Sequence, residues 1–150
     1  MVTVCLNSEK TIKNCLRSSA DLEGVEHIFV DGRSHDQTIE IIELLQKERS
    51  NILLVQEITP RGIYSALNFG MALATGKYVL ILNSDDELVD FENLVNDIKS
   101  RDADIVIGRQ LGSIGDKNIV SIGFEEVKYG PMMKMPWPHG AMIAKKDFFD

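Results

Sequence analysis

The sequence has 150 residues, of which 44% are hydrophobic and 26% charged, enough for the buried core of one globular domain. Its net charge of -7 argues against a protein that holds nucleic acid through the phosphates, because such proteins need basic surfaces. No stretch approaches the roughly 20 apolar residues of a membrane-spanning helix. No signal peptide precedes the first expected strand, so we expect a cytoplasmic protein.

The hydrophobic pattern predicts strands that alternate with helices as far as residue 108. Strands are expected at residues 2–6, 27–30, 51–56, 78–82 and 104–108. Helices are expected around Ile12 and Leu16, at residues 38–47 and 63–74, and from Phe91 to Ile98. Such alternation with short connections is typical of a parallel sheet with helices on both faces. We therefore expect an α/β fold with a Rossmann-like, mostly parallel sheet and right-handed crossovers.

The pattern changes in the last third of the chain. Further strands are expected at residues 117–122 and 141–144, and residues 129–140 between them contain three prolines, which exclude regular structure. This segment is either a loop over a site or a loop that only packs its Met and Trp side chains. Because Asp147 would begin a helix too short to be stable alone, we expect residues 1–150 to be the N-terminal part of a longer domain.

The two cysteines, Cys5 and Cys15, fall in an expected strand and an expected helix. We expect both to be small buried hydrophobic residues in a reducing compartment. A zinc site is not expected, because neither a CxxC nor an HxxxH spacing occurs.

A pair of carboxylates follows the most hydrophobic expected strand. Residues 78–82 run directly into Asn83, Ser84, Asp85 and Asp86. Buried carboxylates are costly unless they are paired or bind a cation, and ligands bind at the C-terminal ends of the strands in open α/β sheets. Asp85 and Asp86 therefore suit Mg²⁺ or Mn²⁺ shared with a phosphate. The alternative is an Asx-type turn or a helix cap.

Two more charged residues are expected at the same edge of the sheet. Asp31 follows the strand at 27–30 and could accept hydrogen bonds from a nucleobase or ribose, with Gly32 allowing close approach. It could equally be a turn residue. Arg61 precedes the helix at 63–74, where N–H groups favour anions, and it could contact a phosphate or lie in solvent. Asp36 directly precedes a helix and is expected to cap it.

The three histidines have different expected environments. His27 is expected to pack inside a strand, and His35 to be a solvated turn residue. His139, beside Trp137 in the irregular loop, is the histidine that we place at a site. A dinucleotide site is not expected, because the sequence has no GxGxxG turn.

Five segments resemble, in order and spacing, the inverting family 2 glycosyltransferases with a GT-A fold. They are residues 4–12, 29–38, 61–70, 74–78 and 82–86. The resemblance is good from residue 2 to about residue 88 and continues weakly to residues 138–140. It implies a nucleotide-diphosphate sugar donor, a saccharide or lipid-linked acceptor, and a role in cell-surface polysaccharide biosynthesis.

The resemblance also implies roles for particular residues. Asp31 would bind the base, and Arg61 would lie near the nucleotide or its phosphates. Asp85 and Asp86 would form a DXD-like motif, with Asp85 near the ribose and the metal and Asp86 on the metal. The Mg²⁺ or Mn²⁺ would neutralise the leaving diphosphate. His139 would lie on the acceptor side.

The sequence departs from the family pattern at several positions. Asn83 stands where many relatives have Asp, Leu6 replaces an aromatic residue that often stacks on the base, and Ser65 replaces a frequent Asp. The general base of the family lies in a later motif that no segment matches, so we expect it beyond Asp150 and leave the catalytic residue unknown.

Two other functions compete with the transferase. One is a truncated or degenerate module that binds a nucleotide or a partner without catalysis. The other is a sugar-phosphate nucleotidyltransferase, which would need a basic, Gly-rich loop where Asn7, Ser8 and Glu9 stand. If exposed, the apolar side chains of the irregular loop would favour self-association or peripheral contact with a membrane; they are Met132, Met133, Met135 and Trp137.

Overall fold

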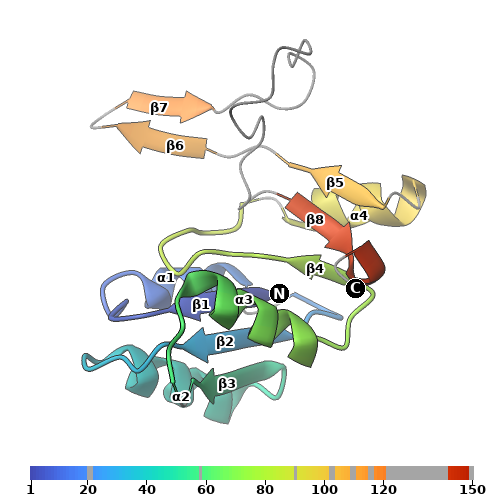
Figure 1. Cartoon of the computed structure of the whole chain (residues 1–150). Helices are drawn as coiled ribbons and strands as arrows, with labels where there is room; N and C mark the ends of the chain where they lie inside the picture. The colour runs from blue at the N-terminus through green and yellow to red at the C-terminus, as the bar shows by residue number, and fades with distance from the viewer. Residues whose placement is uncertain are drawn as a thin grey trace, which may run out of the picture.

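The computed structural model describes residues 1–19, 22–57, 59–89, 91–101, 104–108, 111–114, 117–120 and 142–148 (Figure 1). The irregular loop with His139 and Trp137, and the end of the chain at Asp150, lie outside these residues.

A parallel sheet forms the centre of the molecule. Strands β1 (Val2–Cys5), β2 (His27–Asp31) and β3 (Ile52–Gln56) pair in parallel in the order β1-β2-β3. Strand β4 (Tyr78–Leu80) runs parallel to β1 on its other side, through a bridge between Val2 and Ile81. The C-terminal ends of these four strands therefore share one edge, to which the arrowheads of β2 and β3 point in Figure 1.

The strands beyond β4 differ from the expected parallel order. Strand β8 (Met142–Lys145) pairs antiparallel with β4 on one side and with β5 (Ile105–Ile107) on the other. Strands β6 (Leu111–Ile114) and β7 (Lys117–Val120) form a separate antiparallel pair, of which only the second strand was expected. The sheet is thus mostly parallel, as predicted, with one late strand inserted between β4 and β5.

Helices cover both faces of the parallel sheet, as predicted. Helices α1 (Ile12–Ser19) and α2 (Thr38–Glu48) lie on one face, and α3 (Ile63–Leu73) lies on the other (Figure 1). Helix α4 (Phe91–Arg101) packs near β5, and a short 3-10 helix, η3 (Lys146–Phe148), follows β8. None of the helices in the described part of the chain is long and apolar enough to cross a membrane.

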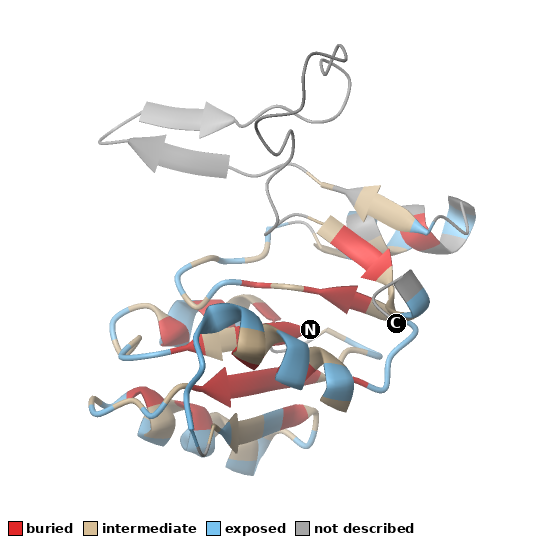
Figure 2. Cartoon of the chain, viewed as in Figure 1, coloured by how far each residue is buried: buried red, intermediate tan, exposed pale blue. Residues whose placement is uncertain are grey.

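The core consists of apolar clusters on the two sides of the sheet. Val2, Val30 and Ala66 belong to the cluster under α3, and Phe29 and Ile42 belong to the cluster under α1 and α2. Figure 2 shows the central strands β1 and β2 buried between exposed helix surfaces. Burying apolar surface on both faces explains why these strands are continuous hydrophobic runs.

Helix α3 lies very close to the sheet because it carries a glycine at the contact. A Cβ atom on Gly70 would lie 2.5 Å from Val2 Cγ1 and 3.0 Å from Val30 Cγ2, so only hydrogen fits there. This close approach fixes the helix that begins at the C-terminal edge of the strands.

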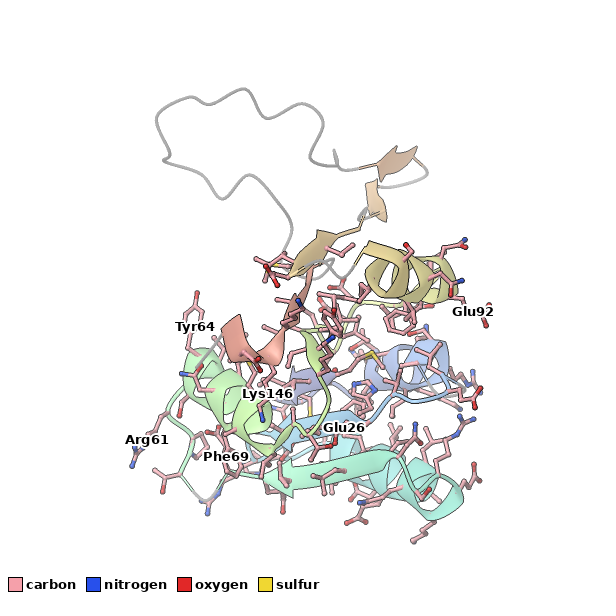
Figure 3. All side chains as sticks on the ribbon, turned by 90° about the vertical axis from the view of Figure 1, so that its right-hand side faces the viewer. Glu26, Arg61, Tyr64, Phe69, Glu92 and Lys146 are labelled. Atoms are coloured by element: carbon pink, nitrogen blue, oxygen red, sulfur yellow. The ribbon has the colours of Figure 1, made fainter. Side chains whose placement is uncertain are left out.

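The turn between α3 and β4 is held from two directions. One carboxylate oxygen of Glu26 accepts hydrogen bonds from Thr75 N, Thr75 Oγ1 and Gly76 N, at 2.6, 2.8 and 2.9 Å. Lys146 Nζ donates to the carbonyl of Ala74 (Figure 3). These contacts fix the start of β4 and therefore the position at which its acidic C-terminal end emerges.

Candidate functional site

The acidic turn is the segment of residues 83–86 that follows β4. Asp86 N donates to the Asn83 carbonyl at 3.1 Å, and Asn83 Nδ2 donates to Asp86 Oδ2 at 2.9 Å. The side chain of Asp85 is exposed, whereas that of Asp86 is half-buried. The segment is therefore both a local turn and a display of two carboxylates at the edge where the strands end.

The two carboxylates suit a hard cation only in combination with further ligands. No group of three or more His, Cys, Asp or Glu side chains that could hold a metal occurs among the described residues. Mg²⁺ sites commonly use one or two carboxylates together with substrate phosphates and water. The donor set of Asp85 and Asp86 fits such a shared site, and it does not fit a cage built from protein ligands alone.

Several hydrogen bonds anchor this turn to β1 and to the region of α1. They run from Leu82 N to the Val2 carbonyl (3.0 Å), from Cys15 Sγ to the Asn83 carbonyl (3.6 Å), between the hydroxyls of Ser8 and Ser84 (3.0 Å), and from Leu88 N to Ser18 Oγ (2.9 Å). The turn is thus held beside β1 and the loop that follows it, and β1 separates the turn from β2.

Asp31 is completely buried at the end of β2, in register with Cys5 and Gln56. It accepts hydrogen bonds from the hydroxyl and the N–H of Ser34, at 2.5 and 2.9 Å, and from Gln56 Nε2 at 3.4 Å. In this structure Asp31 therefore serves as a turn residue, which is one of the two roles expected for it. A ligand could reach its carboxylate only after Ser34 or Gln56 moves.

The loops after β1 and β2 are joined by reciprocal hydrogen bonds. They link Asn7 N to Ser34 Oγ (2.8 Å), His35 N to Asn7 Oδ1 (2.9 Å), Glu9 N to Asp36 Oδ2 (3.0 Å) and Gln37 N to Glu9 Oε2 (3.2 Å). Asn7 and Arg33 have positive φ angles of 53° and 67°, in the left-handed region that residues other than glycine rarely adopt. Asn tolerates this region, whereas at Arg33 it carries backbone strain, and such strain is common at ligand-binding sites.

Asp36 stabilises the start of α2, as expected of a capping residue. Its Oδ1 accepts hydrogen bonds from the hydroxyl and the N–H of Thr38, at 2.5 and 3.0 Å. Burial by itself would raise the pKa of Asp36, but the hydrogen bonds from Thr38 and Glu9 outweigh burial and lower the pKa. Asp36 therefore remains a charged acceptor at neutral pH.

Arg61 lies in an exposed loop just before α3. Figure 3 shows its side chain extending outward from this loop. The described contacts do not join it to Asp31 or to the acidic turn, so its contact with a phosphate stays a prediction. The N-cap residue of α3 is nevertheless Gly62, which has no side chain to cap the helix, so its N-terminal amides are open to an anion.

Two histidines lie where the sequence predicts. His27 is buried in the core, where its ring nitrogens lie 2.8 Å from the hydroxyls of Thr3 and Ser19, and burial lowers its pKa. His35 is exposed in the loop after β2. The expectation that His139 faces an acceptor falls outside the described residues.

A cavity of about 650 Å³ lies at the opposite edge of the sheet, where the strands begin. Its lining includes Met1, Glu26, Tyr78 and Phe91. Because ligands of open α/β sheets bind at the C-terminal ends of the strands, we do not assign this cavity to the site formed by Asp31 and the acidic turn.

The sequence profile described as glycosyl transferase family 2 matches residues 1–143 of this chain. This match covers β1 to β4 and the acidic turn. The chain belongs to glycosyl transferase family 2. The resemblance of its five segments to this family is thereby confirmed.

The chain is similar to curated members of this family. It is 34% identical over 91 residues to the PGL/p-HBAD biosynthesis glycosyltransferase of Mycobacterium tuberculosis, covering 59% of this chain and 36% of the relative. The chain thus spans about a third of the length of that relative.

Solved structures share the fold of this chain, which confirms the predicted GT-A fold. S. aureus TarS 1–349 in complex with UDP-GlcNAc superposes with a TM-score of 0.77 at 21% identity, over 99% of this chain and 45% of TarS. The mannosyltransferase PcManGT of Pyrobaculum calidifontis, in complex with GDP-Man and Mn²⁺, matches with a TM-score of 0.59 at 25% identity, over 65% of this chain and 30% of PcManGT.

Proposed function

We propose that this chain is the donor-binding part of a glycosyltransferase that moves a sugar from a nucleotide-diphosphate sugar to an acceptor hydroxyl with inversion. The observation that carries the proposal is the acidic turn after β4, which is hydrogen-bonded to β1 and α1 at the edge where β2 ends in Asp31. Membership of family 2, and relatives solved with UDP-GlcNAc and with GDP-Man and Mn²⁺, support it.

Different residues at this edge of the sheet would bind different parts of the donor. Asp85 and Asp86 would hold Mg²⁺ or Mn²⁺, which supplies charge stabilisation for the departing diphosphate when it is bound. Arg61 and the N-terminal amides of α3 would bind the phosphates. Leu6, 58% exposed beside Gly32, would offer apolar surface to the base next to Asp31.

The acceptor side of the reaction lies outside the residues just described. We expect a saccharide or lipid-linked acceptor from the assembly of cell-surface polysaccharide, a cytoplasmic location, and a general base beyond Asp150. His139 keeps its predicted place on the acceptor side. Peripheral contact with a membrane would follow from the apolar residues around Trp137.

Titration calorimetry with UDP, GDP and dTDP, each with and without Mn²⁺, tests the donor site. At least one nucleotide should bind, and Mn²⁺ should tighten its binding by about tenfold or more, because two carboxylates and a diphosphate share the ion. Asp85→Ala and Asp86→Ala should abolish this metal dependence. The neighbouring exposed Glu87→Gln is the matched control and should keep it. Wild-type protein whose nucleotide binding ignores Mn²⁺ would refute the proposal.

A second candidate is a nucleotide-binding module without catalysis. Asn83, which pairs with Asp86 at 2.9 Å, is neutral where the family pattern often has a carboxylate, and this favours a weaker metal site. Release of UDP from a UDP-sugar separates the two candidates. Turnover supports the enzyme. In protein that also carries the general base expected beyond Asp150, metal-dependent binding without turnover, even with acceptor oligosaccharides present, supports the module.

A further inference from the structure

The acidic turn is connected to the start of α2 through a single serine in the loop after β1. Ser8 N donates to Thr38 Oγ1 at 2.7 Å, and the Ser8 hydroxyl lies 3.0 Å from the hydroxyl of Ser84. Ser8 and Ser84 are 76 residues apart in the chain, so this contact exists only because β1 and β4 are neighbours in the sheet.

At the start of α2, the donors and acceptors of this connection can be assigned. The single hydroxyl proton of Thr38 is directed at Asp36 Oδ1, 2.5 Å away, so the oxygen of that hydroxyl accepts from Ser8 N. Asp36 Oδ2 accepts from Glu9 N at 3.0 Å, and Thr38 is completely buried. The backbone of Ser8 therefore has one position relative to α2.

At the other end of the connection, Ser84 lies next to the carboxylates that are proposed to bind the metal. Ser84 directly precedes Asp85, and the local turn ties Asp86 to Asn83. A tether on the Ser84 side chain consequently restricts where the Asp85 side chain begins. Carboxylates in a metal site must be held to within about 0.5 Å, by neighbours that are themselves fixed.

We propose that Ser8 is a positioning residue which, through its hydroxyl contact with Ser84, holds Asp85 and Asp86 in the orientation for metal-dependent nucleotide binding. The inference rests on the proposed function. It adds that a series of hydrogen bonds from Asp36 through Thr38 and Ser8 to Ser84 orients the two carboxylates. Ser8 itself touches neither the metal nor the nucleotide in this scheme.

Calorimetry with UDP, in the presence and absence of Mn²⁺, tests this role in the whole chain. Ser8→Ala and Ser84→Ala should each weaken UDP binding in Mn²⁺ by about 3- to 10-fold, the effect of one lost hydrogen bond. UDP affinity without metal should stay as in the wild type. The double variant should be no weaker than either single variant, because both remove the same contact. Ser50→Ala, at an exposed turn before β3, is the control and should change neither affinity.

Variants of Thr38 distinguish positioning from folding. Thr38→Val removes the hydroxyl at nearly constant volume and should reduce the Mn²⁺ dependence of UDP binding, as Ser8→Ala does. Thr38→Ser keeps the hydroxyl and should retain the Mn²⁺ dependence of the wild type. Equal losses with and without metal, or wild-type affinity in Ser8→Ala and Ser84→Ala, would overturn the positioning role alone. Absence of any metal dependence in the wild-type protein would overturn the proposed function and this inference together.

Discussion

The stability of this protein should fall as the pH drops below about 6.5, because of His27. The imidazole is only 2% exposed, and both ring nitrogens lie 2.8 Å from hydroxyl groups, of Thr3 and Ser19. Burial lowers the pKa of His27 well below its ordinary value of 6.5, and the nearby N-terminal amine lowers it further. The folded protein therefore keeps His27 neutral where the unfolded chain would protonate it.

The sign and size of the effect follow from proton linkage. Between the native and the unfolded pKa the unfolded chain binds more protons, so the free energy of unfolding rises with pH. The stabilisation is complete above the unfolded pKa and is lost as the pH falls below it. A single histidine should remove about 1 kcal/mol between pH 6.5 and 5.5, and about 1.4 kcal/mol for each further pH unit, until the native pKa is reached.

Urea unfolding at several pH values between 5 and 8 measures this slope. His27→Gln lacks the titrating ring, and the difference between wild type and variant isolates its contribution. The comparison matters because burial also lowers the pKa of the Met1 amine, to about 6, and this group titrates in the same range. Identical pH slopes for the wild type and His27→Gln would show that the buried imidazole is not kept neutral, and would refute the reasoning.

Two other predictions concern packing and thiol chemistry. Gly70→Val should lower the free energy of unfolding by about 2–3 kcal/mol, because a Cβ there would lie 2.5 Å from the stiff side chain of Val2; Gly76→Ala, with no neighbour nearer than 3.5 Å, should change it by less than about 0.5 kcal/mol in the same urea titration. Cys5 and Cys15 are buried free thiols, and burial raises both pKa values, that of Cys15 to about 12. Native protein at pH 8 should therefore react with a disulfide reagent far more slowly than urea-unfolded protein, and rapid native labelling would contradict the buried placement.

Much of the fold could be predicted from local pattern. Hydrophobic periodicity located β1 to β4 and the helices between them to within a few residues. This was possible because the spacing of apolar residues within a short segment distinguishes a strand from a helix. The acidic turn was also predictable, because carboxylates at the end of a buried strand are costly unless they are paired or bind a cation. The buried cysteines and the packed His27 follow from the same pattern.

The candidate site was predictable only in part. Sequence patterns select residue types at strand ends, and so pointed to Asp31, Asp85 and Asp86. They allowed a local turn role for Asp31, but they did not show its contact with Gln56, because that contact depends on β3 lying beside β2.

The sequence by itself determined the order of strands and helices and the acidic end of β4, because both depend on residues that are adjacent in the chain. Tertiary structure alone decided that β4 pairs with β1 and that β8 enters between β4 and β5. The pairing of β4 with β1 brings Ser8 to Ser84 and sets the acidic turn beside the loop after β1. The physical reason is that strand pairing depends on the packing of the whole sheet, over separations that no local pattern of hydrophobic residues can specify.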